Sequence, residues 1–342
     1  MPADLTAPDA ATASSGLARA GAAARTRTLV SLLLAPSPAV MRRWALAGLV
    51  TSALIILTGA AVRLSQSGLG CPDWPACTAH SVGASGTTGD SLIHQWVEFG
   101  NRLVTAAIFV VAVGVSVAAW QFRGEDGKRR RDLLWLAAAQ PGAIAAQAVL
   151  GGLVVITKLN PALVSVHFLA SVALIAATVA LWVRCQEGTR PPRPMAPRLV
   201  QLSSYGVIGT VAVMMAVGTV VSGTGPLAGA ANVTRYHLAL GAVAQLHADI
   251  GWLLGGLMVA LLIGLRLGCA PTRAVRLGWV LLGLIGMQAA VGYAQYFAGL
   301  PAGLVWVHVT GATAIWITAL LIPYALRDRG TVTTLPDTSA AR

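Results

Sequence analysis

The chain has 342 residues, of which 56% are hydrophobic and only 11% are charged. This composition excludes an ordinary soluble domain and is typical of a membrane protein. The net charge of +12 does not indicate nucleic-acid binding, because the basic residues follow the membrane topology described below.

The N-terminal segment 1–42 is rich in Ala, Ser, Thr and Arg, and we predict a disordered tail there. Its short apolar run Leu29–Leu34 resembles the core of a signal peptide, but Met41-Arg-Arg43 stands where a cleavage site is expected. We therefore expect an uncleaved tail.

Eight later runs are apolar enough to cross a bilayer, for which a helix needs roughly 20 residues. They cover about 43–63, 93–120, 133–157, 161–184, 200–222, 237–264, 275–297 and 302–326. Backbone that faces lipid must be hydrogen-bonded within its own segment, so all eight runs are expected to be helices. The predicted fold class is an all-α membrane protein with eight transmembrane helices.

The basic residues predict the orientation of these helices. The 24 Lys and Arg residues lie in the two tails and in alternate loops, apart from Arg63, Arg102, Lys158 and Arg235. The positive-inside rule therefore places both termini in the cytoplasm, in a multi-pass protein of the cell (plasma) membrane. The basic loops can also bind anionic lipid headgroups of the bilayer.

The loop between the first and second helices contains Cys71 and Cys77, with two prolines among the five residues between them. On the outer side the loop meets an oxidising compartment, where such a pair can close into a disulfide. The bridge would either staple the loop or take part in redox chemistry.

One face of the second helix is polar. His94, Glu98, Asn101 and Arg102 share it, because the last three follow His94 by four, seven and eight residues. The pattern fits either a covered Glu98–Arg102 ion pair or a site in which Arg102 binds an anionic group, such as a propionate, and Glu98 acts as a base or stabilises positive charge. His94 is either an iron ligand or an interfacial side chain.

Two stretches of the chain are nearly identical. Gln147, Gly151 and His167 recur at one constant offset as Gln288, Gly292 and His308. With four helices in each copy, this is a parallel repeat of two pseudo-symmetric four-helix bundles, related by an axis along the membrane normal. The predicted boundaries are 1–42 (cytoplasmic tail), 43–184 (first bundle), 185–199 (cytoplasmic linker), 200–326 (second bundle) and 327–342 (cytoplasmic tail).

The second bundle contributes two histidines from alternate helices, His247 and His308, which enter from the same side. Such a pair can hold a haem iron from both sides, although each could instead be a core histidine bonded to a backbone carbonyl. The first bundle has His167 but carries Asn101 where alignment places His247, which indicates unequal sites.

Taken together, these residues resemble the haem A synthase family across about 43–326. The resemblance rests on the Cys71–Cys77 loop, on Glu98-x-x-Asn101-Arg102 and on the repeated histidines. It implies an eight-helix oxidoreductase that converts the C8 methyl of haem O to a formyl group, with oxygen from water, giving haem A for terminal oxidases.

The resemblance also implies roles for individual residues. His247 and His308 would ligate the iron of a resident haem b, the first bundle would receive haem O with His167 on its iron, and Glu98 would be essential to the oxidation. Cys71 and Cys77 would form the family's outer-loop disulfide. The implied partners are the haem O synthase that supplies the substrate and a quinone or another electron acceptor.

This chain departs from the family pattern at Asn101, where a histidine is usual. The substrate iron would then be held by His167 alone or also by His94. The alternative function is a two-haem b-type membrane cytochrome that transfers electrons from quinol, which predicts matching ligand sets in both bundles.

Overall fold

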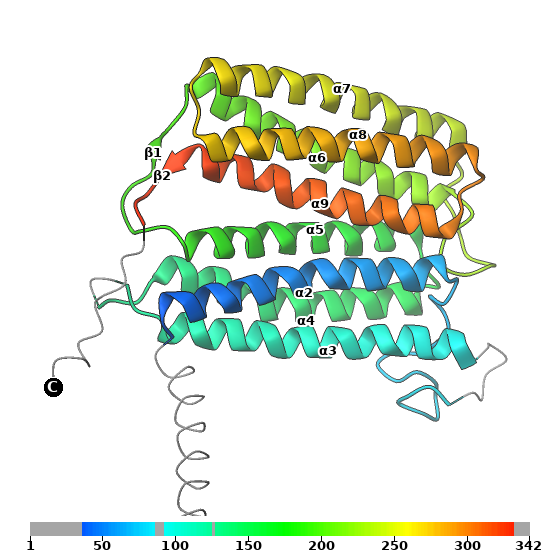
Figure 1. Cartoon of the computed structure of the whole chain (residues 1–342). Helices are drawn as coiled ribbons and strands as arrows, with labels where there is room; N and C mark the ends of the chain where they lie inside the picture. The colour runs from blue at the N-terminus through cyan, green and yellow to red at the C-terminus, as the bar shows by residue number, and fades with distance from the viewer. Residues whose placement is uncertain (1–35, 86–91, 125–126, 332–342) are drawn as a thin grey trace, which may run out of the picture.

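The computed structural model describes residues 36–85, 92–124 and 127–331. Within this part of the chain, eight helices are long and apolar enough to span a membrane, as predicted. They are α2 (Pro38–Leu64), α3 (Leu92–Gln121), α4 (Arg131–Ile156), α5 (Pro161–Arg184), α6 (Arg198–Thr224), α7 (Leu240–Leu267), α8 (Thr272–Phe297) and α9 (Ala302–Ala325). Figure 1 shows the helices side by side, with their axes roughly aligned.

The first helix begins earlier than the apolar run predicted. The Ser37 side chain accepts a hydrogen bond from the backbone N–H of Val40, and Pro38 occupies the first turn, so helix α2 starts there and not at 43. The prediction of a tail over 1–42 is therefore wrong for residues 38–42, while residues 1–35 lie outside the described part. Arg42 and Arg43 interrupted the apolar run without interrupting the helix.

The helices form two groups of four. In the first group α2, α3, α4 and α5 contact one another in a ring, and in the second group α6, α7, α8 and α9 do the same. The groups meet through α2, α5, α6 and α9, and one hydrophobic cluster spans this contact, including Ile56, Ile175, Met258 and Ile322. The pseudo-twofold axis and the other domain boundaries remain predictions.

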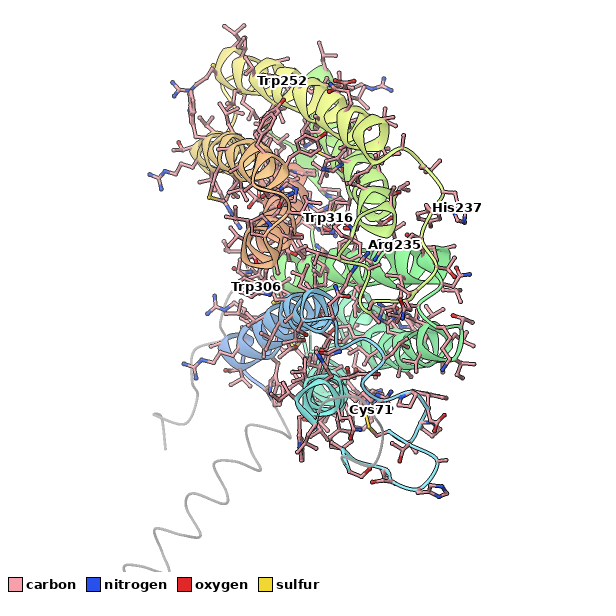
Figure 2. All side chains as sticks on the ribbon, turned by 90° about the vertical axis from the view of Figure 1, so that its right-hand side faces the viewer. Cys71, Arg235, His237, Trp252, Trp306 and Trp316 are labelled. Carbon is pink, nitrogen blue, oxygen red and sulfur yellow. A yellow bond between two sulfur atoms is a disulfide. The ribbon has the colours of Figure 1, made fainter. Side chains whose placement is uncertain are left out.

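Two indoles also join the groups. Trp306 of α9 donates a hydrogen bond through Nε1 to the backbone oxygen of Leu57 at 3.0 Å, and Trp316 donates to that of Val172 at 2.9 Å. Figure 2 shows both tryptophans at heights between Trp252 near the top and Cys71 near the bottom. Indole N–H groups satisfied in this way fix the two groups relative to each other.

We call the end of the helices that carries the Cys71–Cys77 loop the disulfide end. Here Arg63 of α2 reaches the second group and donates to the backbone oxygens of Ser222 (2.7 Å) and Leu227 (2.9 Å). The N–H of Gly68 also donates to the oxygen of Gly229 at 2.9 Å. The loops of the two groups are therefore interlocked at this end.

At the opposite end, which we call the tail end, ionic contacts tie the groups. Glu187 follows α5 and accepts from Arg184 at 2.7 Å and from Arg327 at 2.9 Å. Arg327 belongs to β2 (Arg327–Asp328), which pairs antiparallel with β1 (Arg193–Pro194) of the predicted linker. These arginines hold the pKa of Glu187 below its ordinary value, although burial alone would raise it.

Candidate functional site

A buried carboxylate lies under the disulfide loop in the first group. Glu98 of α3 is 5% exposed, and its two oxygens have different partners. One accepts a hydrogen bond from the backbone N–H of Cys71 at 2.7 Å, and the other accepts from Arg102 at 2.7 Å. The predicted ion pair between Glu98 and Arg102, one helical turn apart, is thus present. The carboxylate oxygen that does not contact Arg102 is hydrogen-bonded to the Cys71 N–H.

Arg102 also binds the loop itself. Its guanidinium donates to the backbone oxygens of Cys71 (3.1 Å), Asp73 (3.0 Å), Pro75 (3.3 Å) and Ala76 (3.0 Å). The predicted disulfide between Cys71 and Cys77 is formed. It closes the loop segment 71–77 into a ring, and the backbone carbonyls of this ring point to Arg102. The guanidinium is therefore the centre around which the loop folds.

His94 lies near the start of α3, where the same loop passes. Its Nδ1 is 2.8 Å from the hydroxyl oxygen of Ser67, the residue four positions before Cys71. His94 is thus placed at the loop, two turns from Arg102 along the helix. Its role as an iron ligand remains a prediction.

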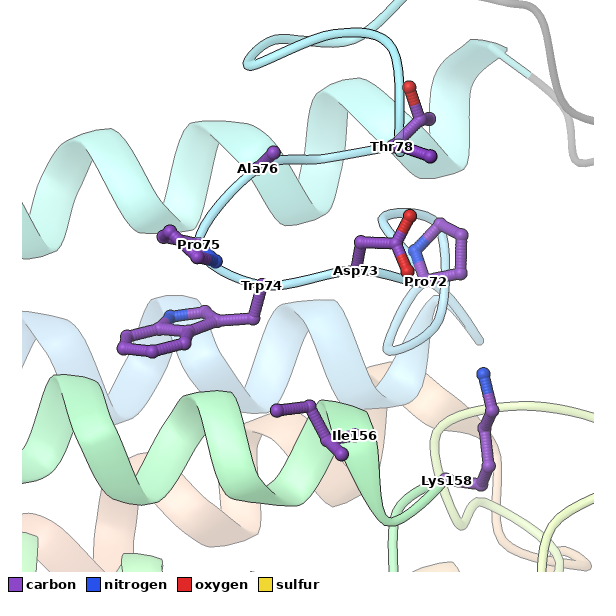
Figure 3. Close-up of a pocket in the computed structure, with 9 residues that line it drawn as sticks. Pro72, Asp73, Trp74, Pro75, Ala76, Thr78, Ile156 and Lys158 are labelled. Carbon is purple, nitrogen blue, oxygen red and sulfur yellow. The ribbon is translucent and has the colours of Figure 1, made fainter.

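The loop also places an aromatic ring on α4. A Cβ added to Gly152 would lie 2.4 Å from the indole of Trp74, so only glycine allows this contact. Figure 3 shows Trp74 between the loop and α4, at the edge of a hollow of about 420 Å³ that Asp73, Ile156 and Lys158 also line. The repeat is broken here, because the second copy has Tyr293 where the first has Gly152.

The repeated residues turn out to position the histidines. The side-chain amide of Gln147 on α4 donates to the backbone oxygen of His167 on α5 at 3.0 Å, and Gln288 on α8 donates to that of His308 on α9 at 2.7 Å. The repeated glycine lies beside the ring in each case. A Cβ at Gly151 would be 3.4 Å from Cε1 of His167.

The same arrangement holds in the second copy, where a Cβ at Gly292 would be 3.2 Å from Cε1 of His308. In each copy, therefore, a glutamine side chain holds the backbone of the next helix at the histidine, and a glycine leaves room for the imidazole ring. The sequence showed that the glutamine and glycine repeat but not that they act on the histidine.

The second group brings two imidazoles together. The ring centroids of His247 and His308 are 6.3 Å apart, with 55° between the ring planes. Two rings bound to opposite sides of one metal ion through bonds of about 2 Å have centroids roughly 6 Å apart. The spacing is what two ligands of one metal would have, and the role of the pair as ligands stays a prediction.

Several buried polar atoms near the repeated histidines have no hydrogen-bond partner among the residues that the structure describes. They include Nδ1 of His167 and of His308 and the amide oxygens of Gln147 and Gln288. Oδ1 of Asn101 on α3 is likewise buried without a partner among these residues. Leaving such an atom unpaired costs about 1–3 kcal/mol. Both groups thus carry polar atoms at these positions that a bound group or water can satisfy.

The sequence of this chain is similar to a known family and to several named proteins. Residues 42–320 match the family COX15-CtaA, described as cytochrome oxidase assembly protein. The protein named heme A synthase from Shewanella oneidensis is 26% identical over 337 residues, covering 83% of this chain and 96% of its own length. Proteins of the same name from Lysinibacillus sphaericus (33% identical) and Oceanobacillus iheyensis (30%) match over 37% and 34% of this chain, and over 39% and 35% of their own lengths.

Proposed function

Because this chain belongs to the COX15-CtaA family of cytochrome oxidase assembly proteins, we propose that it is a haem A synthase, as its relatives are named. This oxidoreductase converts the C8 methyl group of haem O to a formyl group and so makes haem A. The observation that carries the proposal is the contrast between two paired imidazoles in one group of helices and one imidazole with a buried carboxylate in the other.

We assign His247 and His308 to the iron of a resident haem b. The 6.3 Å between their rings supports this assignment, as does the glycine that lies beside each ring, Gly218 at His247 and Gly292 at His308. When bound, haem b supplies one-electron redox chemistry. The chain's part is to hold the rings, and the amide of Gln288 does so by fixing the backbone at His308.

The first group is the proposed site for the substrate haem O. His167 holds the substrate iron, supported by the same glutamine and glycine pair that surrounds His308. Asn101 offers an amide in place of an imidazole, so His167 acts alone or with His94. The Ser67 hydroxyl holds His94 at the edge of the loop.

Glu98 is the proposed catalytic residue. Loss of two electrons and a proton from the substrate methyl group gives a methylene cation, which a nearby carboxylate stabilises. Water adds to this cation with loss of a proton and gives the alcohol. A second two-electron oxidation, with loss of two protons and addition of a second water, gives a gem-diol that loses one water to form the aldehyde. Arg102 and the Cys71 N–H keep the Glu98 carboxylate fixed in orientation through this sequence.

Arg102 is better placed to position the loop than to bind a propionate. Both of its terminal nitrogens already donate to loop carbonyls, and the contact with Glu98 occupies another of its N–H groups. Binding of a propionate through these terminal nitrogens, one of the two alternatives that the sequence left open, requires the loop carbonyls to release at least one donor.

The proposed location is the cell membrane, with the disulfide end outside and both termini in the cytoplasm. The distribution of Lys and Arg supports this orientation, and an oxidising compartment favours the Cys71–Cys77 bridge. A haem O synthase in the same membrane supplies the substrate, and a quinone or another acceptor removes the electrons.

A two-haem cytochrome would need a pair of ligands in each group. The alignment instead places Asn101 opposite His247, and the first group adds a buried carboxylate. These differences favour the enzyme over the electron carrier.

The test is to incubate the purified protein with haem O and ferricyanide as electron acceptor, and then to extract and identify the pigments. We expect formyl haem to accumulate. Unchanged haem O together with rapid reduction of the protein by quinol would contradict the proposal and support the cytochrome.

A further inference from the structure

A hollow of about 420 Å³ lies between the disulfide loop and the end of α4. Residues of the segment 72–79 line it from the loop, and Ile156 and Lys158 line it from α4 and the turn that follows. Figure 3 shows Trp74 on one side and Lys158 on the other, with Ile156 between them. We call this space the loop hollow. None of its side chains takes part in the reaction proposed above.

Two side chains of opposite charge line the loop hollow. Asp73 and Lys158 are both exposed, and among the described residues neither side chain has an ion pair or a hydrogen bond. The other Lys and Arg residues described at the disulfide end all donate to backbone oxygens; they are Arg63, Arg102 and Arg235. The hollow therefore offers one carboxylate and one ammonium group to a ligand.

The backbone at Lys158 has a conformation that favours glycine. Its φ is 55°, in the left-handed region, where a side chain is sterically disfavoured. The offset of the repeat aligns Lys158 with Gly299, whose φ is 77°, and the residues that follow, Leu159 and Leu300, have φ values of 60° and 61°. The two turns are thus built alike, and the first copy accepts strain to place a lysine where the second has glycine. Backbone strain of this kind is concentrated at functional positions.

The loop hollow lies at the level of the lipid head groups. Helix α4 has 26 residues, so at about 1.5 Å per residue it covers roughly 39 Å, more than the ~30 Å hydrocarbon core of a bilayer. Lys158 comes two residues after the end of α4, and a tryptophan such as Trp74 is typical of the membrane interface. Toward the middle of the membrane, one exposed apolar strip of α4 continues from the hollow, formed by Val149, Leu153 and Ile156. A hydrocarbon chain can lie along this strip.

We propose that the loop hollow binds the head group of phosphatidylethanolamine. The two charges of this lipid complement those of the hollow. Its phosphate accepts hydrogen bonds from the Lys158 ammonium group, and its own primary ammonium group donates to the Asp73 carboxylate. Trp74 packs against the glycerol region, and one acyl chain follows α4 past Ile156. The bound lipid links the disulfide loop to the turn between α4 and α5.

The charges of the hollow also predict which lipids bind less well. Phosphatidylglycerol carries a phosphate but no cation, so it would leave the Asp73 carboxylate unpaired beside a second negative charge. Phosphatidylcholine has a quaternary ammonium group, which has no N–H to donate to Asp73. Selectivity for a primary ammonium group therefore distinguishes this site from a general contact with lipid.

The experiment titrates the purified full chain in detergent with phosphatidylethanolamine, phosphatidylcholine or phosphatidylglycerol of identical acyl chains, and counts bound lipid by native mass spectrometry. We expect phosphatidylethanolamine to bind most tightly. Lys158→Gln and Asp73→Asn should each weaken its binding about tenfold, which corresponds to about 1.4 kcal/mol. Lys128→Gln, which removes the only other lysine of the chain, should leave the binding unchanged.

A second variant separates binding from a structural role of the lysine. Lys158→Gly introduces the residue that the second copy has at this position. It should bind phosphatidylethanolamine as weakly as Lys158→Gln does. Because glycine relieves the left-handed backbone, its unfolding temperature without added lipid should equal or exceed that of the wild type. A lower unfolding temperature would show that the lysine stabilises the turn itself, and would overturn its assignment to a ligand.

Equal binding of the three lipids would overturn the inference, as would unchanged binding in Lys158→Gln or in Asp73→Asn. Tighter binding of phosphatidylglycerol would overturn it by showing a site for anions alone. Displacement of the lipid by haem O in the wild type, with loss of haem O binding in Lys158→Gln, would assign the hollow to a propionate of the substrate and would also overturn the inference.

Discussion

Each of the two groups of helices holds one histidine in the same way, His167 in the first and His308 in the second. The groups differ in the residues that the other helices contribute. In both, a glutamine on the preceding helix donates to the backbone oxygen of the histidine, and a glycine one turn further lies beside the ring. The second group adds His247 at 6.3 Å from His308. The first group has Asn101 at the aligned position and a carboxylate, Glu98, one turn before Arg102. The two groups thus place one imidazole in the same way and differ at the position of the second histidine and in the buried carboxylate.

The groups also differ in the side chain that covers the second-to-last turn of their third helix, α4 in the first group and α8 in the second. The second group uses its own Tyr293, which pairs with Trp252 of the neighbouring helix. The first group has Gly152 there and receives Trp74 from the disulfide loop. At this position the first group is therefore covered by a loop that Arg102 and Glu98 hold, whereas the second group has a tyrosine of α8 hydrogen-bonded to a tryptophan of α7.

The largest effect is expected from neutralising the carboxylate that distinguishes the first group. Glu98→Gln preserves the shape and can still accept the Cys71 N–H, but it removes the negative charge. We expect haem A formation to fall by about 10²–10⁴-fold, while the haem b content stays unchanged, as measured by pigment extraction. Glu187→Gln, which removes a carboxylate at the tail end, is the control. A Glu98→Gln enzyme with normal turnover would remove the catalytic role of this residue.

A smaller effect is expected from filling the place where the loop meets α4. Gly152→Ala would put a Cβ 2.4 Å from the Trp74 ring, so the indole must move and the protein should lose about 1–3 kcal/mol of stability. The control is Gly142→Ala on the same helix, where a Cβ meets nothing within 4 Å. Thermal unfolding in detergent and protease cleavage of the loop measure both variants. Equal stability and equal cleavage would show that Trp74 does not close the first group.

The smallest effect concerns the ionic link between the groups at the tail end. Arg327 and Arg184 lower the pKa of Glu187 from 4.5. A lowered pKa stabilises the folded state above 4.5, and this stabilisation is lost as the pH falls through the folded-state pKa. Because the site is partly exposed, Glu187→Gln should cost only about 1 kcal/mol at neutral pH.

The difference between the unfolding temperatures of wild type and Glu187→Gln should therefore shrink as the pH is lowered below 4.5. Arg329, which has no salt bridge among the described residues, offers a nearby control in Arg329→Gln. A difference that stays constant from neutral to acid pH would show that the charge of Glu187 does not link the groups.

Much of the fold follows from the sequence because lipid imposes a simple rule on the backbone. Every predicted span is a helix, and most ends agree within three residues. The start of α2 was missed because Arg42 and Arg43 end the apolar run, while the helix continues to its cap at Ser37. Charged residues near a membrane surface end an apolar run in the sequence, but the backbone hydrogen bonds of the helix continue through them.

The site was only partly predictable. Periodicity placed Glu98 and Arg102 on one face, and their spacing predicted the ion pair. The four loop carbonyls on Arg102 and the contact of Trp74 with Gly152 arise from residues brought together by the tertiary fold. The one available signal was the break in the repeat at Gly152, where the second copy has Tyr293.

The central claim is that the two groups hold haem for different purposes. It is tested most directly by the haem content and axial-ligand spectrum of purified His247→Ala, His308→Ala and His167→Ala. We predict that the first two variants lose the low-spin spectrum of haem b. His167→Ala should keep that spectrum and fail to bind haem O. Loss of haem b in all three variants, or in none, would contradict the claim.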